Sequence, residues 1–154
     1  MITTTRTRTA ALGLTAIAAL ALAGAGAAAA AQAAPPGAPA IPLTSGQETP
    51  RPIDGGGAHG SFSYEIDGDE LCYSLEVSGL STPAVAAHVH LADRNVAGPV
   101  VVPLVIEGAT DFDIETCVTG DPAVLAAIEA DPSNYYINVH TTLNPPGEVR
   151  GQLK

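Results

Sequence analysis

The chain has 154 residues, of which 46% are hydrophobic and 4% aromatic, and its formal net charge is −10. Residues 34–154 number 121 and hold all 16 acidic residues but only four of the six basic ones, so their net charge is four minus 16, or −12. This acidity disfavours nucleic acid and anionic membranes as partners, and the length fits one domain with its own core.

The first 33 residues have the pattern of a signal peptide. Arg6 and Arg8 precede a run of small and apolar residues over 10–31, and Ala-Gln-Ala at 31–33 is a small-x-small cleavage site. A retained membrane anchor is the alternative, but the run is only weakly apolar and no charged stop-transfer segment follows it. The sequence therefore predicts a cleaved signal peptide over residues 1–33 and a secreted mature chain that does not insert into the membrane.

A Pro/Ala-rich linker is predicted over residues 34–41, followed by one folded domain over 42–154. Within this domain, short runs of alternating apolar and polar residues are separated by Gly, Pro and Asp, which is typical of antiparallel β-structure. The predicted strands cover residues 61–66, 71–77, 85–91, 98–106, 112–118, 135–140 and 148–153. Asp67-Gly68 predicts a hairpin turn between the first two, because glycine accepts the positive φ that such a turn needs.

Two of these strands and one helix have further signals. In 85–91 the apolar face is expected to comprise Val85, Ala87, Val89 and Leu91. The strand 98–106 is almost continuously apolar and is expected to be covered on both faces, although its Pro103 indicates an edge or a bulge. Asp121 as N-cap, with proline at the next position, predicts a helix. The predicted fold is all-β, an antiparallel Greek-key-like β-sandwich or barrel with one short helix.

Cys72 and Cys117 are the only two cysteines. In an exported chain they are expected to form a disulfide, and the absence of CxxC spacing makes a metal-thiolate site the weaker alternative. Both cysteines alternate with apolar residues, so both lie on non-core faces. Their pairing predicts that the strands 71–77 and 112–118 are neighbours.

Four motifs carry a resemblance to a known family. They are residues 43–50 (LTSGQETP), 87–91 (AHVHL) followed by 98–104 (GPVVVPL), 136–141 (YINVHT) and 146–153 (PGEVRGQL). In this order they resemble the CHRD domain, named after chordin, an extracellular antagonist of growth factors, and the chain is similar to bacterial single-domain exported members. One departure is at 95–97, where the family loop is richer in glycine.

The resemblance implies a location and a fold more than an activity, because the bacterial members have no assigned activity. It implies an exported, non-catalytic binding or structural module, whose partner is an extracellular protein or a cell-surface ligand. The residues agree with this, since no GxSxG elbow is present and the glycines at 55–57 lack the ending of a phosphate-binding loop. We therefore expect that the protein is not an enzyme.

Three of the four histidines form the strongest candidate site. His88 and His90 are two residues apart on one strand face, and His140 lies on the non-core face of another strand, so the three rings can meet if those strands are neighbours. This pattern is similar to the copper-binding pair of copper,zinc superoxide dismutase, but too few histidines remain for a dismutase site. The alternative function is therefore a copper- or zinc-binding metalloprotein. Hydrogen bonding to backbone or carboxylate groups is the purely structural explanation.

Overall fold

The computed structural model describes residue 1 and residues 39–53 and 56–154, so residues 2–33 of the predicted signal peptide and 34–38 of the predicted linker lie outside the described residues. The described residues form eight strands: β1 (Ile41–Thr44), β2 (His59–Asp67), β3 (Glu70–Ser78), β4 (Ala84–Leu91), β5 (Val100–Leu104), β6 (Phe112–Thr119), β7 (Tyr135–Thr141) and β8 (Val149–Gln152). The described helices are α1 (Pro122–Ala130) and two short 3-10 helices, η1 (Ser45–Gln47) and η2 (Pro132–Asn134). In this part of the chain, no helix is long and apolar enough to cross a membrane.

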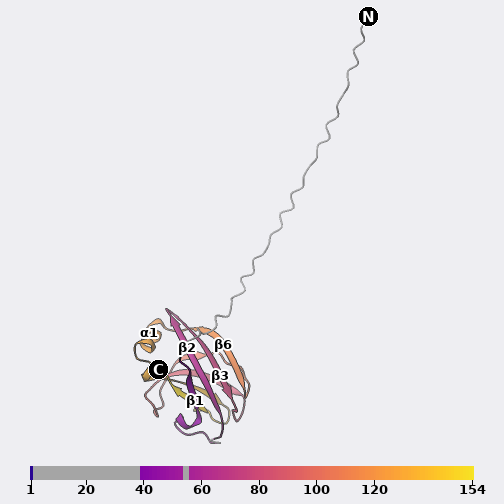
Figure 1. The fold of residues 1–154 in the computed structure, drawn as a ribbon. Helices are drawn as coiled ribbons and strands as arrows, with labels where there is room; N and C mark the ends of the chain where they lie inside the picture. The colour runs from indigo at the N-terminus through magenta and orange to yellow at the C-terminus, as the bar shows by residue number, and fades with distance from the viewer. Residues whose placement is uncertain (2–38, 54–55) are drawn as a thin grey trace.

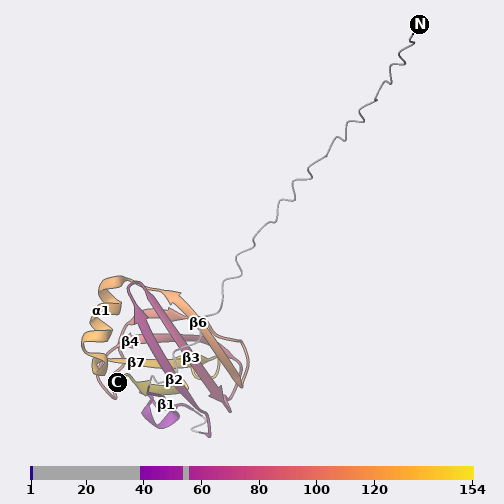
Figure 2. The same ribbon diagram turned by 45° about the horizontal axis from the view of Figure 1, so that its top comes forward.

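All eight strands belong to one antiparallel sheet with the order β5-β4-β7-β8-β1-β2-β3-β6. The sheet curls into a nearly closed barrel (Figure 1). In Figure 2, β2, β3 and β6 run diagonally in front of β4 and β7, and α1 lies at one side. The predicted all-β antiparallel class with one short α-helix is confirmed.

The barrel interior is filled by alternate residues of the strands. On β3 the four core positions are fully buried: Leu71, Tyr73, Leu75 and Val77. The Tyr73 hydroxyl finds its acceptor inside this apolar layer, because it donates a hydrogen bond to the Val105 carbonyl at 2.7 Å. This bond joins the middle of β3 to the chain just beyond β5, across the gap between the two edges of the sheet.

The expected hairpin joins β2 and β3. Asp67 pairs with Glu70, so the turn residues are Gly68 and Asp69, and Gly68 has a φ of 63°. The helix also begins as predicted, since Asp121 accepts a hydrogen bond from the Ala123 amide at 2.8 Å. The β2–β3 hairpin and the start of α1 therefore both follow from the turn and capping residues in their own segments.

Two expectations about β4 and β5 are wrong in part. Val85 and Leu91 are 55% and 43% exposed, because the pairing of β4 shifts register near both of its ends and only the middle of the strand keeps the core alternation. β5 is an edge strand, as Pro103 indicated, but it is not covered on both faces, since Val100 is 49% exposed.

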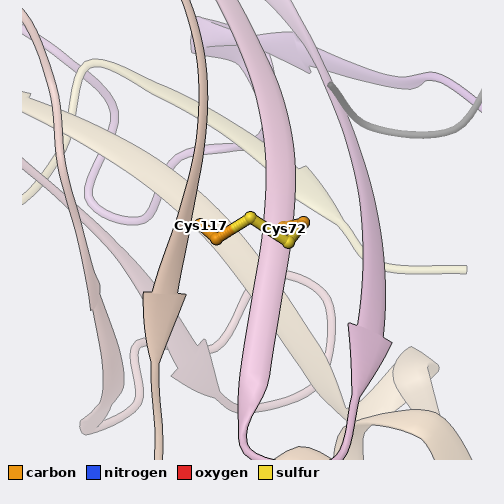
Figure 3. The surroundings of a disulfide bond; sticks show 2 residues. All are labelled: Cys72 and Cys117. Atoms are coloured by element: carbon orange, nitrogen blue, oxygen red, sulfur yellow. A yellow bond between two sulfur atoms is a disulfide. The ribbon is translucent and has the colours of Figure 1, made fainter. Parts of the chain in front are cut away.

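Cys72 and Cys117 form a disulfide between β3 and β6 (Figure 3). The two residues are direct partners in the ladder, with their Cα atoms 3.9 Å apart. The predicted pairing and the predicted contact between the two strands are both confirmed. The disulfide fastens β6, the edge strand at one end of the sheet, to its only strand neighbour in the described sheet.

Candidate metal centre

The three histidines project from adjacent strands onto the outer face of the sheet. His88 and His90 flank Val89 on β4, and His140 follows Val139 on β7, while both valines are fully buried in the barrel core. β4 and β7 pair antiparallel. Side chains on one face of neighbouring strands are within contact distance, so the pairing of β4 with β7 brings His140 close to two histidines that precede it by 52 and 50 positions.

The three rings meet at one point. One ring nitrogen from each of His88, His90 and His140 lies within 4.8 Å of the others. Ligand nitrogens at about 2 Å from a tetrahedral ion are roughly 3.3 Å apart, so a small rotation of the side chains would close the set around an ion. The predicted clustering of the histidines is confirmed, and metal binding by them remains a prediction.

Backbone carbonyls set the tautomers of two rings. His90 Nδ1 is 2.9 Å from the Gly98 carbonyl oxygen, and His140 Nδ1 is 2.9 Å from that of Pro145. A carbonyl oxygen only accepts, so both Nδ1 atoms carry the proton and both Nε2 atoms present a lone pair. Metal-binding histidines usually have this arrangement, in which the second ring nitrogen donates to a fixed oxygen.

The third ring, that of His88, is hydrogen-bonded to His140. His88 Nδ1 lies 3.0 Å from His140 Nε2, which must be the acceptor because the proton of His140 is on Nδ1. His90 Nε2, in contrast, is buried and has no hydrogen-bond partner among the described residues. A metal ion would replace the bond between His88 and His140 and would satisfy His90 as well.

The surroundings keep the three rings neutral. Burial lowers the pKa of His88 and His90, and burial together with the neighbouring rings lowers the pKa of His140 to about 4, although its bond to Pro145 opposes the shift. Neutral imidazole is the form that binds a metal ion, so no proton has to be displaced from the lone pairs at neutral pH.

These shifts predict that the metal-free protein loses stability in acid. The unfolded chain takes up a proton on residue 140 near pH 6.5, whereas the folded chain does so only near pH 4. The contribution of neutral His140 to the free energy of unfolding is therefore complete above pH 6.5 and decreases as the pH drops. We expect a loss of about 1 to 2 kcal/mol between pH 7.5 and pH 5. The measurement is urea unfolding with a chelator present, comparing wild type with His140→Gln.

The comparison of wild type with His140→Gln separates the effect of His140 from that of Glu48, whose protonation changes stability in the opposite direction. Burial raises the pKa of Glu48 to about 7, so Glu48 stabilises the fold as the pH falls, equally in both proteins. If the unfolding free energies of wild type and His140→Gln change in parallel over this range, the neutral buried state of His140 is wrong.

Side chains of β7 and β8 hold the β4–β5 loop beside the histidines. The Tyr136 ring stacks on His90 with centroids 4.8 Å apart, and its hydroxyl accepts from the Gly98 amide. Arg150 lies over the Tyr136 ring and donates to the carbonyls of Val96 and Asp93. The backbone oxygen that orients His90 is therefore fixed from two sides.

Sequence reasoning did not assign Asn138, Glu48 or Arg150 to the histidine site. Tyr136 and Asn138 share the alternation of His140 along β7, and this was the available signal. Glu48 had no comparable signal, and the burial of the charged groups of Glu48 and Arg150 depends on loops that pack over the outer face of the sheet.

Comparison with known proteins assigns the family. The family model described as CHRD domain matches residues 40–153, which is most of the chain. The chain belongs to the CHRD family. No curated protein and no solved structure gives a significant match. The match contains all three clustered histidines and both cysteines, and a CHRD domain suggests a non-catalytic binding module.

Proposed function

We propose that this CHRD protein is exported and acts outside the cell as a non-catalytic binding module whose site takes a transition-metal ion, copper or zinc. The observation that carries the proposal is the convergence of His88, His90 and His140, with ligand nitrogens within 4.8 Å. Imidazole nitrogen suits both metals. In His90 and His140, Nδ1 donates to a backbone carbonyl, so Nε2 is the nitrogen that carries the lone pair.

Binding is better supported than turnover. Two pockets, of about 350 and 260 Å³, are lined by other residues, and neither contains any of the three histidines. His90 and His140 are buried, with at most 9% of their surface exposed. A buried ligand set outside these pockets suits retention of a small ion better than processing of an organic substrate.

The extracellular assignment has separate support. The first 33 residues have the signal-peptide pattern, and the Cys72–Cys117 disulfide is of the kind that persists in oxidising compartments. An extracellular protein or a cell-surface ligand remains the expected class of macromolecular partner. The metal ion is the ligand for which the chain offers a defined set of donor atoms.

Calorimetric titration of the purified, chelator-treated protein with Zn(II) and Cu(II) tests the proposal. We expect one ion per chain, and at least about 100-fold weaker affinity in His90→Ala and His140→Ala, because loss of a ligand costs more than loss of its outer partner. His59→Ala is the matched control, since the His59 side chain is exposed on β2 and its Nδ1 hydrogen-bonds the Gly57 carbonyl, away from the three clustered histidines. Equal affinity in all four proteins, or no binding by wild type, would refute the metal site.

A further inference from the structure

Asn138 lies on the same outer face as the three histidines. It is the direct ladder partner of His88 across β4 and β7, and it precedes His140 by two residues on β7. The face therefore carries two pairs of polar side chains, each two residues apart: His88 with His90, and Asn138 with His140. Asn138 is 1% exposed, so its polar atoms need partners inside the protein.

The orientation of the Asn138 amide is fixed from its nitrogen side. Nδ2 donates to the Pro146 carbonyl oxygen at 3.2 Å, and a Cβ placed on Gly147 would collide with both this Nδ2 and Glu48 Oε1. The amide nitrogen therefore points to the β7–β8 loop and the Glu48 carboxyl. The opposite side of the amide presents Oδ1, which is buried and has no hydrogen-bond partner among the described residues.

Asn138, whose Oδ1 has no partner among the described residues, is a neighbour of His90, whose Nε2 has none either. In the ladder between β4 and β7, Asn138 faces His88 directly and lies diagonally across from His90 on the same face, within reach of its side chain. In the part of the chain that the structure describes, neither His90 Nε2 nor Asn138 Oδ1 has a hydrogen-bond partner. With the His90 proton on Nδ1, both atoms are acceptors, and two acceptors cannot satisfy one another.

A shared cation resolves this conflict. On the basis of the proposed histidine site, we infer that Asn138 Oδ1 is a further donor to the same ion, and that the resulting set of three imidazoles and one amide oxygen selects a divalent ion, Zn(II) or Cu(II), over Cu(I). An amide oxygen is a hard ligand that suits divalent ions, whereas Cu(I) prefers soft sulfur donors. The Pro146 carbonyl holds the amide as an outer partner, as such groups hold metal ligands generally.

Two substitutions at position 138 test the oxygen. Asn138→Leu keeps the volume and removes the donor, whereas Asn138→Asp keeps an oxygen at the same place. Affinities for Zn(II), Cu(II) and Cu(I) are measured by competition with chromogenic chelators. We expect Asn138→Leu to weaken binding of both divalent ions about tenfold or more and to leave Cu(I) binding unchanged, and Asn138→Asp to retain divalent binding.

The control is Asn134→Leu, at an exposed asparagine of η2, and circular dichroism checks the fold of each variant. Absence of binding by wild type refutes the proposed function itself. If wild type binds and Asn138→Leu binds divalent ions equally well, the site stands and the role of Asn138 is overturned. Equal weakening for Cu(I) overturns the selection of divalent ions. If Asn138→Leu does not fold, loss of Zn(II) affinity in Asn138→Asp overturns the oxygen donor, and retained affinity supports it.

Discussion

Replacing both cysteines with serine is expected to lower the free energy of unfolding by roughly 4 kcal/mol, the chain-entropy value for the loop that the disulfide closes. Cys72 and Cys117 are 45 positions apart in the sequence, and this loop contains most of β3, all of β4 and β5, and most of β6. In the unfolded state the disulfide holds the ends of this long segment together, so its loss gives the unfolded chain more conformations. The ladder between β3 and β6 already brings the residues together in the folded state.

Urea unfolding of the oxidised wild type and of the double serine variant measures the difference. Reduced wild type is the control, because it lacks the crosslink but keeps both native side chains, and its midpoint should match that of the variant. A change below about 1 kcal/mol would contradict the expected role of the loop. Titration of two free thiols in the denatured, unreduced protein would show that the pairing does not form.

Most of the barrel was predictable from local patterns. The alternation of Leu71, Tyr73 and Leu75 places these side chains in the core, and the hairpin before them follows from a glycine that adopts positive φ. The helix follows from its Asp121 cap and the proline after it. Each of these features is decided by residues within a few positions of one another.

The errors concern features that depend on distant pairing. The expected core positions of Val85 and Leu91 followed from strict alternation along the strand, but the ladder shifts register near each end of β4. The apolar run that contains β5 was expected to be covered on both faces. The order of strands places it at the edge of the sheet, and this order is a property of the whole chain.

The candidate site was predictable only in part, because it depends both on local alternation and on the pairing of distant strands. Alternation indicates that His88 and His90 share a face, and that His140 lies on a non-core face. Their convergence also requires that β4 and β7 be neighbours, which the sequence pattern left as a condition. The alternation along the strand places Asn138 on the same face as His140, but it did not indicate Asn138 as a ligand. An amide is a less common metal ligand than an imidazole, and the importance of Asn138 depends on its burial.

Arg150 shows how the loop over the outer face is retained. It is 1% exposed and donates to the carbonyls of Asp93 at 3.0 Å and Val96 at 2.9 Å. Its guanidinium carbon lies 3.3 Å from the centre of the Tyr136 ring. Arginine suits this position because its flat group can stack on an aromatic ring while its edges donate to fixed oxygens.

Arg150→Ala is expected to lower the free energy of unfolding by roughly 3 kcal/mol or more, because two hydrogen bonds from a charged donor and the stacking on Tyr136 are lost together. Arg150→Lys is the matched control. It keeps the charge but cannot hold both carbonyls and the ring at once, so its loss should be smaller. Urea unfolding gives the energies, and hydrogen exchange over residues 92–98 shows whether the loop opens. Because the Gly98 carbonyl orients His90, we expect metal affinity to decrease when the loop becomes less ordered. An Arg150→Ala variant with the unfolding free energy and the hydrogen exchange of wild type would contradict this role of Arg150.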